Sequence, residues 1–164
     1  MYHNTTLKEL MSEDLPSLTY QRKICYLTSV REVKALFRLI NKEIFGNRLS
    51  MPKFEVRGRL MGSWGECHGM DFIPYRTGKS RCLIVLADRW YCRQWLIMAL
   101  AHEMCHQYEW DIISKRRERE GLPPIMSHGP TFFRWRDKLK KKGIPLKKYN
   151  NHEKWFKTQH LFRC

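Results

Sequence analysis

One uninterrupted stretch of this chain constrains its fold more than any other. From Tyr91 to about Arg117 the sequence contains no Gly or Pro, and its apolar residues recur at helical spacing with Ala, Leu and Met between them. Asp88 can cap the amino end, and the cations from Lys115 to Arg117 suit the negative carboxyl end of a helix dipole. The stretch is therefore predicted to form one long helix.

The middle of this helix carries His102-Glu103-Met104-Cys105-His106, which matches the HExxH motif. Residues four apart lie on one helix face, so His102 and His106 can bind the same ion. Glu103, beside the first ligand, can accept a proton from water at the open coordination position. The simpler alternative is ordinary core or surface residues, but burying two imidazoles and a carboxylate without a metal would be costly. The motif therefore predicts a metal site, with Cys105 turned away as a small core residue.

A catalytic zinc usually has three protein ligands, so a third ligand is expected downstream of the motif. The extended variant HExxHxxGxxH is excluded, because Glu109 and Ile112 occupy the positions of its Gly and its third His. An acidic ligand on a following helix would be Glu118 or Glu120. Both belong to the run Lys115–Glu120, which is charged throughout and typical of a solvated surface.

The preferred third ligand is His128, which precedes Gly129-Pro130 at the start of a second amphipathic helix. The turn would hold the imidazole, and Pro130 would pre-set the first helical residue. This helix would pack against the long helix through Phe132, Phe133, Trp135 and Leu139. The alternatives are that His128 is only a turn residue, or that His152 or His160 in the basic tail is the ligand.

The segments HEMCHQYEW and SHGPTFFRW together resemble the SprT-like metalloprotease domain, the family that includes Spartan. In that family HExxH on one helix is followed by a third zinc His shortly before a Gly and an aromatic-rich helix. Upstream, Leu36–Phe45 with Asn47-Arg48-Leu49 is similar to the family's first helix, and Cys82–Ala87 stands where the family has a strand. The resemblance covers about Ser29 to Gly143. It implies an α+β fold: a single zincin-like domain with an N-terminal helix, a small antiparallel or mixed sheet, the long HExxH zinc helix and a following C-terminal helix.

The resemblance also implies an activity, that of a zinc-dependent metalloendopeptidase acting on proteins bound or crosslinked to DNA. One catalytic Zn²⁺ would be held by His102, His106 and His128, with Glu103 as the general base. An oxyanion-stabilising residue is expected, and Tyr108, Tyr91 and several arginines are candidates. One departure from the family is clear: the six cysteines contain no CxxC pair, so the zinc ribbon that many members carry cannot be built.

The size of the chain indicates one domain. With 164 residues it can bury one substantial core, and we divide it into an N-terminal arm (1–28), the metalloprotease domain (29–143) and a basic aromatic tail (144–164). No apolar run approaches about eighteen residues and the N-terminus is not basic and then apolar, so neither a membrane span nor a secretory signal is expected. The irregularly spaced cysteines fit reduced thiols. We expect a cytoplasmic monomer.

The net charge is concentrated near the C-terminus. The formal charge is +15, and from Arg134 to Cys164 eleven Lys or Arg stand against Asp137 and Glu153. Aromatic residues are interleaved with these cations: Trp135, Tyr149, Trp155, Phe156 and Phe162. This composition can follow a phosphate backbone and stack on bases, so it predicts DNA or another nucleic acid as a partner. The alternative is a solvated basic helix face whose aromatic residues pack on the domain.

Further elements are predicted upstream of the long helix. Ser29-Val30-Arg31-Glu32 matches a capping box, and an apolar stripe to Phe45 ended by Gly46 predicts a helix. Strands are predicted at 52–60 and 82–87, and the three glycines between Met61 and Pro74 indicate a hairpin with tight turns. A protein substrate would add as a strand to an open sheet edge, and the pattern leaves open which strand forms it.

Two rival functions remain compatible with these residues. One is a nucleic-acid-binding or adaptor protein in which the metal only braces the fold, and the other is a zinc hydrolase acting on a small amide. Glu103 discriminates the first from a protease, because a structural zinc needs a fourth protein ligand and has no need of a general base.

Overall fold

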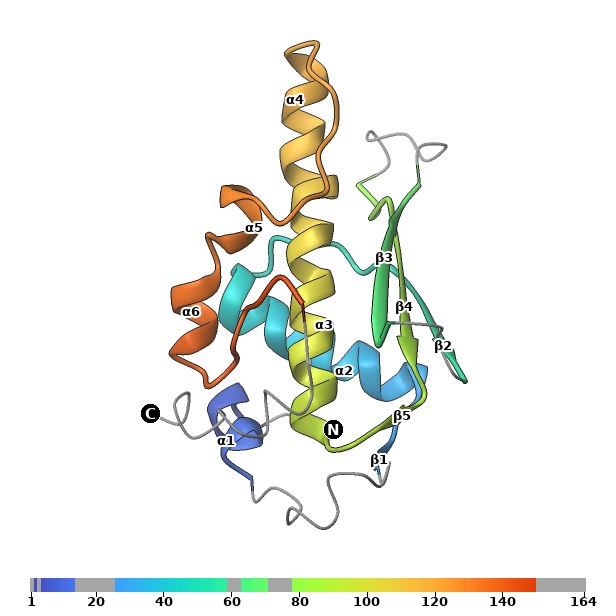
Figure 1. Ribbon diagram of the computed structural model, residues 1–164, viewed down its shortest axis with the longest axis vertical. Coiled ribbons are helices and arrows are strands. Elements are labelled where there is room, and N and C mark those ends of the chain that lie inside the picture. Colours follow the sequence, from blue (N-terminus) through green and yellow to red (C-terminus); the bar gives the residue numbers. More distant parts are fainter. Residues whose placement is uncertain (1, 3, 14–25, 59–62, 71–77, 150–164) are drawn as a thin grey trace.

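A long rod of helix passes through the middle of the molecule, with a small sheet on one side and short helices on the other (Figure 1). The computed structural model describes residues 2, 4–13, 26–58, 63–70 and 78–149. The fold is mixed α and β, in agreement with the predicted α+β class. None of the described helices is long and apolar enough to cross a membrane.

The rod confirms the predicted long helix. It consists of α3 (Arg93–Tyr108), the π-helical turn η4 (Glu109–Ser114) and α4 (Lys115–Arg119), which follow one another without a break. All residues of α3 from Gln94 to Tyr108 are buried, which explains why apolar residues surround the whole helix instead of one face. The predicted cap at Asp88 is wrong: the N-cap is Cys92, because residues 89–90 form strand β5 (Arg89–Trp90) before the helix begins.

The predicted first helix is also confirmed, as α2 (Val30–Ile40) followed by a π-helical turn, η2 (Asn41–Phe45). Gly46 ends it in the left-handed conformation, with φ 63°. The capping box is only half formed. Ser29 Oγ accepts the Glu32 amide at 3.3 Å, but the Glu32 carboxylate accepts hydrogen bonds from Tyr2, Tyr26 and Thr28.

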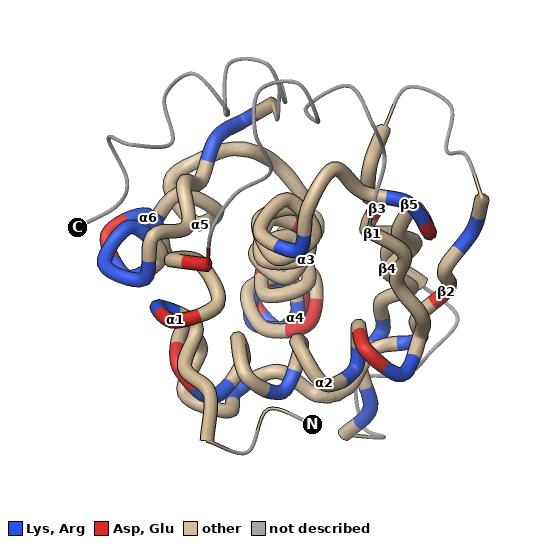
Figure 2. The backbone as a smooth tube through the Cα atoms, turned by 90° about the horizontal axis from the view of Figure 1, so that it is seen from below, with Lys and Arg blue, Asp and Glu red and all other residues tan. Residues whose placement is uncertain are grey.

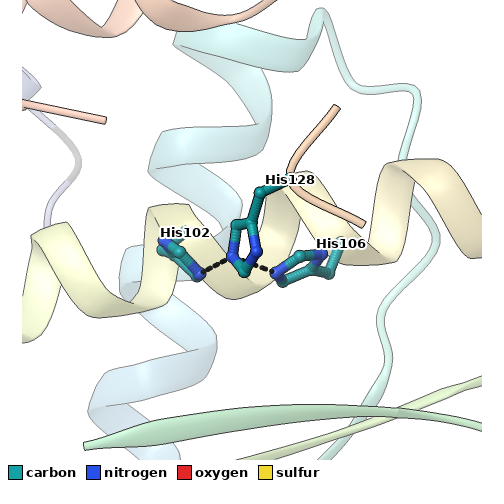
Figure 3. Close-up of side chains that lie close together, drawn as sticks. All are labelled: His102, His106 and His128. Atoms are coloured by element: carbon teal, nitrogen blue, oxygen red, sulfur yellow. Dashed lines mark hydrogen bonds between the residues drawn. The ribbon is translucent and has the colours of Figure 1, made fainter. Parts of the chain in front are cut away.

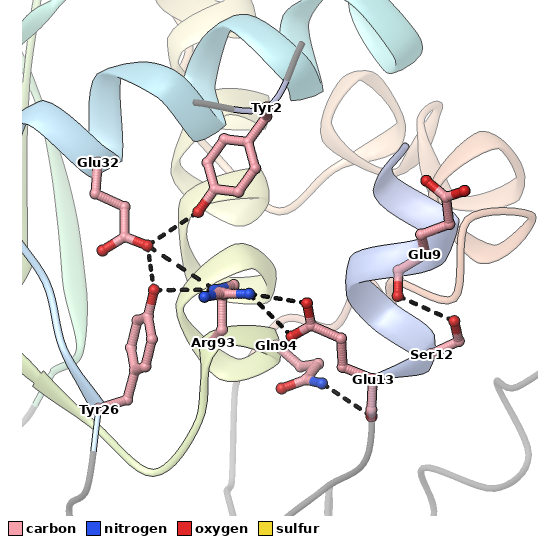
Figure 4. A network of polar contacts seen from close by, with 8 residues as sticks. All are labelled: Tyr2, Glu9, Ser12, Glu13, Tyr26, Glu32, Arg93 and Gln94. Atoms are coloured by element: carbon pink, nitrogen blue, oxygen red, sulfur yellow. Dashed lines mark hydrogen bonds and ion pairs between the residues drawn. The ribbon is translucent and has the colours of Figure 1, made fainter. Parts of the chain in front are cut away.

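These bonds belong to a polar network that joins the N-terminal residues to the start of α3 (Figure 4). Arg93 lies at its centre and binds both the Tyr26 hydroxyl, at 3.0 Å, and the Glu13 carboxylate, at 2.8 Å. Just before Glu13 lies α1 (Leu7–Ser12), a helix that the sequence pattern did not predict. Its N-terminus has a complete capping box between Thr6 and Glu9. Its residues Leu7, Leu10 and Met11 are buried in the core.

The sheet has the order β2-β4-β3, with β2 (Lys53–Arg57) parallel and β3 (Gly65–Gly69) antiparallel to the central β4 (Cys82–Ala87). It is therefore the small mixed sheet that was expected, and both predicted strands are present. β4 is buried along nearly its whole length, as its continuous apolar run requires. A separate short ladder pairs β1 (Tyr26–Leu27) with β5.

The glycines of β3 do not make the tight turns that were predicted. Gly65 and Gly69 lie within the strand, and the reason is close contact with other elements. A Cβ atom at residue 69 would lie 2.3 Å from the Trp110 ring, and one at residue 65 would lie 2.9 Å from Leu86 Cδ2. Only glycine allows β3 to come this close to the central helix.

The helix predicted after His128 is broken into α5 (Pro130–Phe133) and α6 (Arg136–Lys140). Phe132, Trp135 and Leu139 are buried, as expected for its apolar side. The chain then returns toward α3, and Ile144 and Leu146 are also buried in the core. The domain boundaries proposed from the sequence stay a prediction.

Candidate metal centre

Three histidines meet at the surface of α3. His102 and His106 project from successive turns of the helix, and His128 reaches them from the loop before α5 (Figure 3). The Nε2 atom of His128 lies 3.1 Å from Nε2 of His102 and 3.2 Å from Nε2 of His106. One ligand atom from each residue lies within 4.8 Å of the others. The three side chains thus form a single cluster.

The donor set of this cluster fits a divalent cation. Ligands of a tetrahedral zinc at Zn–N distances of about 2.0–2.1 Å are separated by about 3.3–3.4 Å, close to the two shortest distances in the cluster. Burial, and then the neighbours His106 and His128, lower the pKa of His102 to about 3. The pKa of His128 is also lowered, chiefly by burial. Both imidazoles are therefore neutral at pH 7, which is the form that binds a metal.

Phe132 forms the apolar floor beneath the cluster. Its ring centroid lies 4.8 Å from that of His102, 4.6 Å from that of His106 and 4.8 Å from that of His128. The side chain is fully buried, and Pro130 at the first turn of α5 helps to place it. An apolar shell of this kind limits solvent access to a metal site.

Glu109 is an important residue of the site that the sequence analysis did not identify. Its carboxylate is fully buried and lies 3.4 Å from Nδ1 of His106. It also accepts the Ser127 amide at 2.8 Å and the Thr131 hydroxyl. Burial raises the pKa of Glu109, but hydrogen bonds from His106, Thr131 and Ser127 outweigh that effect, so the net shift is downward. The one available sequence signal was its spacing, three residues after His106 on a helix.

Glu103 lies on α3 next to the cluster and is 7% exposed. Burial, and to a lesser extent the nearby Glu66, raise its pKa to about 8. A Cβ atom at Gly65 of β3 would lie 3.2 Å from both Glu103 Cγ and Oε1. The carboxyl is thus enclosed between α3 and β3, at the edge of an open cavity.

That cavity has a volume of about 570 Å³. One wall is the segment of residues 63–68, which includes most of β3, and the opposite wall is α3 with the three histidines. Among the described strands, β2 and β3 each pair only with β4, so both have an open edge. Of these two strands, β3 is the one that lines the cavity. The remaining lining residues come from elsewhere in the chain: Met126, Lys148 and Tyr149.

Four of the other sequence candidates, Tyr108, Tyr91, Glu118 and Glu120, are not among the described residues that line this cavity. Tyr108 is buried against Phe45 and Trp135, and its hydroxyl lies 3.3 Å from Arg134 Nη1. Tyr91 is not one of the described residues that line the cavity. Glu118 and Glu120 are exposed on α4, far along the chain from the cluster. His152 and His160 lie outside the described residues.

The polar residues that the structure instead brings near the histidine cluster are Lys148 and Tyr149. Both line the cavity, and the Tyr149 ring centroid lies 6.1 Å from that of His128. No local pattern connects these residues with HExxH, because they follow it by about forty positions and reach it only through the return of the chain after α6.

Comparison with known proteins agrees with this site. A model of the SprT-like family matches residues 33–154, which is most of the 164-residue chain. A search of curated proteins found no match. The matched range contains Glu103 and all three histidines of the cluster.

Proposed function

Since this chain belongs to the SprT-like family, as its motifs predicted, we propose that it is a zinc-dependent metalloendopeptidase with a zincin-like domain. The family indicates a metalloprotease-type domain. The observation that carries the proposal is the cluster of His102, His106 and His128, which could hold a metal ion beside a buried glutamate. The proposal also assigns the metal, the residues that carry the reaction and the class of substrate.

His102, His106 and His128 would hold one Zn²⁺ through their Nε2 atoms. When bound, zinc supplies a Lewis acid for the scissile carbonyl and lowers the pKa of a coordinated water toward about 7. Glu109 would act as an orienting carboxylate, because it contacts Nδ1 of His106 and so favours the tautomer with a free Nε2 lone pair.

Glu103 would be the general base. Its carboxylate would accept the proton of the attacking water and later donate it to the leaving nitrogen of the peptide. A carboxyl whose pKa is raised to about 8 readily holds a proton near neutral pH, and a bound cation would lower that pKa again. Lys148 and Tyr149 line the same cavity and are the candidates for hydrogen bonding to the developing oxyanion.

A protein substrate would lie along β3 in extended form. Support comes from the open edge of β3, which borders the cavity and passes directly over Glu103. Backbone hydrogen bonds to an edge strand align a peptide without regard to its side chains. Such binding suits an enzyme that acts on many different proteins.

We further propose that the substrate is protein bound or crosslinked to DNA. This rests on the family and on the basic C-terminal surface, which could bind DNA or another nucleic acid. A cytoplasmic location and a monomeric state remain part of the proposal.

The rival is a nucleic-acid-binding or adaptor protein with a purely structural metal. A closed structural site would need four protein ligands, whereas the described residues offer a group of three. The position of Glu103 next to this group, at the cavity, also favours catalysis.

The test is cleavage of a DNA-binding protein by the zinc-loaded chain, with and without single-stranded DNA, beside Glu103→Gln. The variant is expected to retain zinc and to lose at least about 100-fold in rate, since general-base catalysis contributes about 10²–10⁴. Glu118→Gln is the control, because Glu118 is an exposed carboxylate on α4 and is not among the described residues that line the cavity. Absence of cleavage by fully zinc-loaded wild-type protein would favour the adaptor.

A further inference from the structure

The metal-centre cavity has an apolar end, on the side of the N-terminus of α3. Trp64 and Ala99 both line the cavity there. Ala99 precedes His102 by about one helical turn, so these two side chains share one face of α3. Trp64 directly precedes Gly65, the residue that lies against Glu103. We call the part of the cavity that Trp64 and Ala99 border the aromatic pocket.

The Trp64 wall of the aromatic pocket is held in place by other aromatic rings. The centroid of its ring lies 5.5 Å from those of Trp90 and Tyr91 and 6.2 Å from that of Trp95, within the range of about 4.5–7 Å at which aromatic pairs attract each other. Trp90 and Trp95 are fully buried, whereas Trp64 is half-buried. The backbone carbonyl of Trp64 also accepts the Ala87 amide at 3.1 Å. The wall is therefore preformed.

The opposite wall, on α3, is apolar and leaves room for a side chain. Between Arg93 and Glu103 the helix carries no Lys, Arg, Asp or Glu, and Figure 2 draws this stretch in tan. Ala99 ends at its Cβ atom, so the helix face beside His102 is not filled by its own side chain. The neighbouring Ser63 also lines the cavity, but its hydroxyl already donates to Glu66 at 2.7 Å. Such a lining suits an apolar group.

The direction of β3 determines which residue of a peptide would reach this pocket. β3 runs in the same direction as α3, because Gly65 lies against Glu103 and Gly69 lies against Trp110. Antiparallel strand pairs are slightly more stable than parallel ones, so a peptide added to the open edge of β3 would run opposite to both elements. Its carboxyl-terminal part would then lie at the end of the cavity that Trp64 borders.

We propose that the aromatic pocket binds an apolar side chain of the substrate, that of the residue directly after the scissile bond. Trp64 and Ala99 would then be the residues that determine specificity. This inference rests on the proposed function and narrows its substrate class to segments with a residue such as Leu or Phe at that position. Backbone pairing with β3 would align many peptides, and the pocket would select which bond lies beside Glu103.

The test combines binding with cleavage, so that the pocket and the protease activity are judged separately. The probes are fluorescently labelled octapeptides of Gly and Ser with one variable central residue, which is Gly, Ala, Leu, Phe or Asp. Anisotropy measures their binding to the zinc-loaded full chain carrying Glu103→Gln. Mass spectrometry of the products with active protein identifies the bond that is cleaved, and kcat/KM is measured for each peptide.

The pocket variant is Ala99→Leu, whose added atoms would fill the space from the helix side. Ala35→Leu is the matched control, because it makes the same change at a half-buried position on α2 that is not among the described residues lining the cavity. Zinc content and melting temperature show whether both variants are folded. The series of peptides on the chain without these changes tests the pocket even if Ala99→Leu does not fold.

The Leu and Phe peptides are expected to bind at least about 10-fold more tightly than the Gly peptide and to be cleaved on the amino side of the variable residue, since one methylene alone contributes about 10-fold or more to discrimination in an apolar pocket. Ala99→Leu should reduce this preference at least about 10-fold, and Ala35→Leu should keep it.

Equal binding of the Gly and Leu peptides, or an unchanged preference in folded Ala99→Leu, would overturn the proposal. Cleavage on the carboxyl side of the apolar residue would overturn the assigned direction. Cleavage without any preference would leave the proposed function intact and refute the pocket. Selective binding without cleavage would support the pocket and count against the protease.

Discussion

At the scale of single residues, Glu109 joins the two parts of the chain that supply the candidate ligands. Its buried carboxylate contacts His106 on one side and the backbone of Ser127, next to His128, on the other. The π-helical turn η4 begins at this residue, and such turns are frequent at functional sites. Glu109 can therefore set the orientation of His106 and the position of the His128 loop at once.

Glu109→Gln is expected to weaken zinc binding by about 10–100-fold, the usual effect of losing an orienting partner of a metal ligand. An amide keeps the size of the side chain but loses the charge that holds the Nδ1 proton of His106. The measurement is competition for zinc with a chromophoric chelator. Glu120→Gln, at an exposed carboxylate that pairs with Arg116 on α4, should bind zinc as the wild type does. Equal affinities for all three proteins would show that Glu109 only supports the loop.

At the scale of elements, the contact between β3 and α3 depends on the absence of side chains on the strand. Gly65 lies directly over Glu103, and Gly69 lies against Trp110. The same closeness brings the open edge of β3 to the candidate base. Strand and helix therefore form one cleft in which a peptide could be aligned.

Gly65→Ala is expected to lower kcat by about 10-fold or more while zinc content stays at one equivalent. The added Cβ would lie 3.2 Å from Glu103 Cγ, so the carboxylate or the strand must move, and small misplacements of a catalytic group reduce rates strongly. Steady-state kinetics beside metal analysis would measure the effect. Gly58→Ala is the control, because a Cβ there meets nothing within 4 Å. Wild-type kcat in Gly65→Ala would argue against Glu103 as the base.

At the scale of the whole molecule, the proposed zinc would bind side chains from two segments that are distant in sequence and that the fold brings together. Two ligands come from the central rod and the third from a loop 22 residues after His106. A ligand that binds only the folded state stabilises it, by about 2.7 kcal/mol when its concentration is 100 times its dissociation constant. Chelation should therefore lower the melting temperature of this chain.

His128→Ala is expected to bind less than one equivalent of zinc and to melt at the same temperature with and without chelator. Loss of one of the three ligands removes the link between α3 and the His128 loop through which a bound ion would stabilise the fold. Metal analysis and thermal unfolding would measure both effects. His68→Ala is the matched control, since His68 lines the same cavity but pairs with Glu66. Full zinc retention by His128→Ala would refute the ligand assignment.

Local order along the chain was sufficient to predict the long helix, the capped helix α2, the strands β2 and β4, and the placement of His102 and His106 on one helix face. Each of these depends on residues only a few positions apart, where spacing fixes which side chains share a face. The choice of His128 as third ligand stays a prediction, and the meeting of the three imidazoles in one cluster supports it.

The tertiary structure alone decided the contacts of Glu109 with Ser127 and Thr131, the reason for Gly65 and Gly69, and the approach of Lys148 and Tyr149 to the cluster. The partners of these residues lie far away in sequence, and no helical or strand period relates positions at such separations. Their positions follow from how α3, β3 and the segment after α6 pack around one core. A side chain's neighbours across a core are set by that packing, and a single sequence records only its local part.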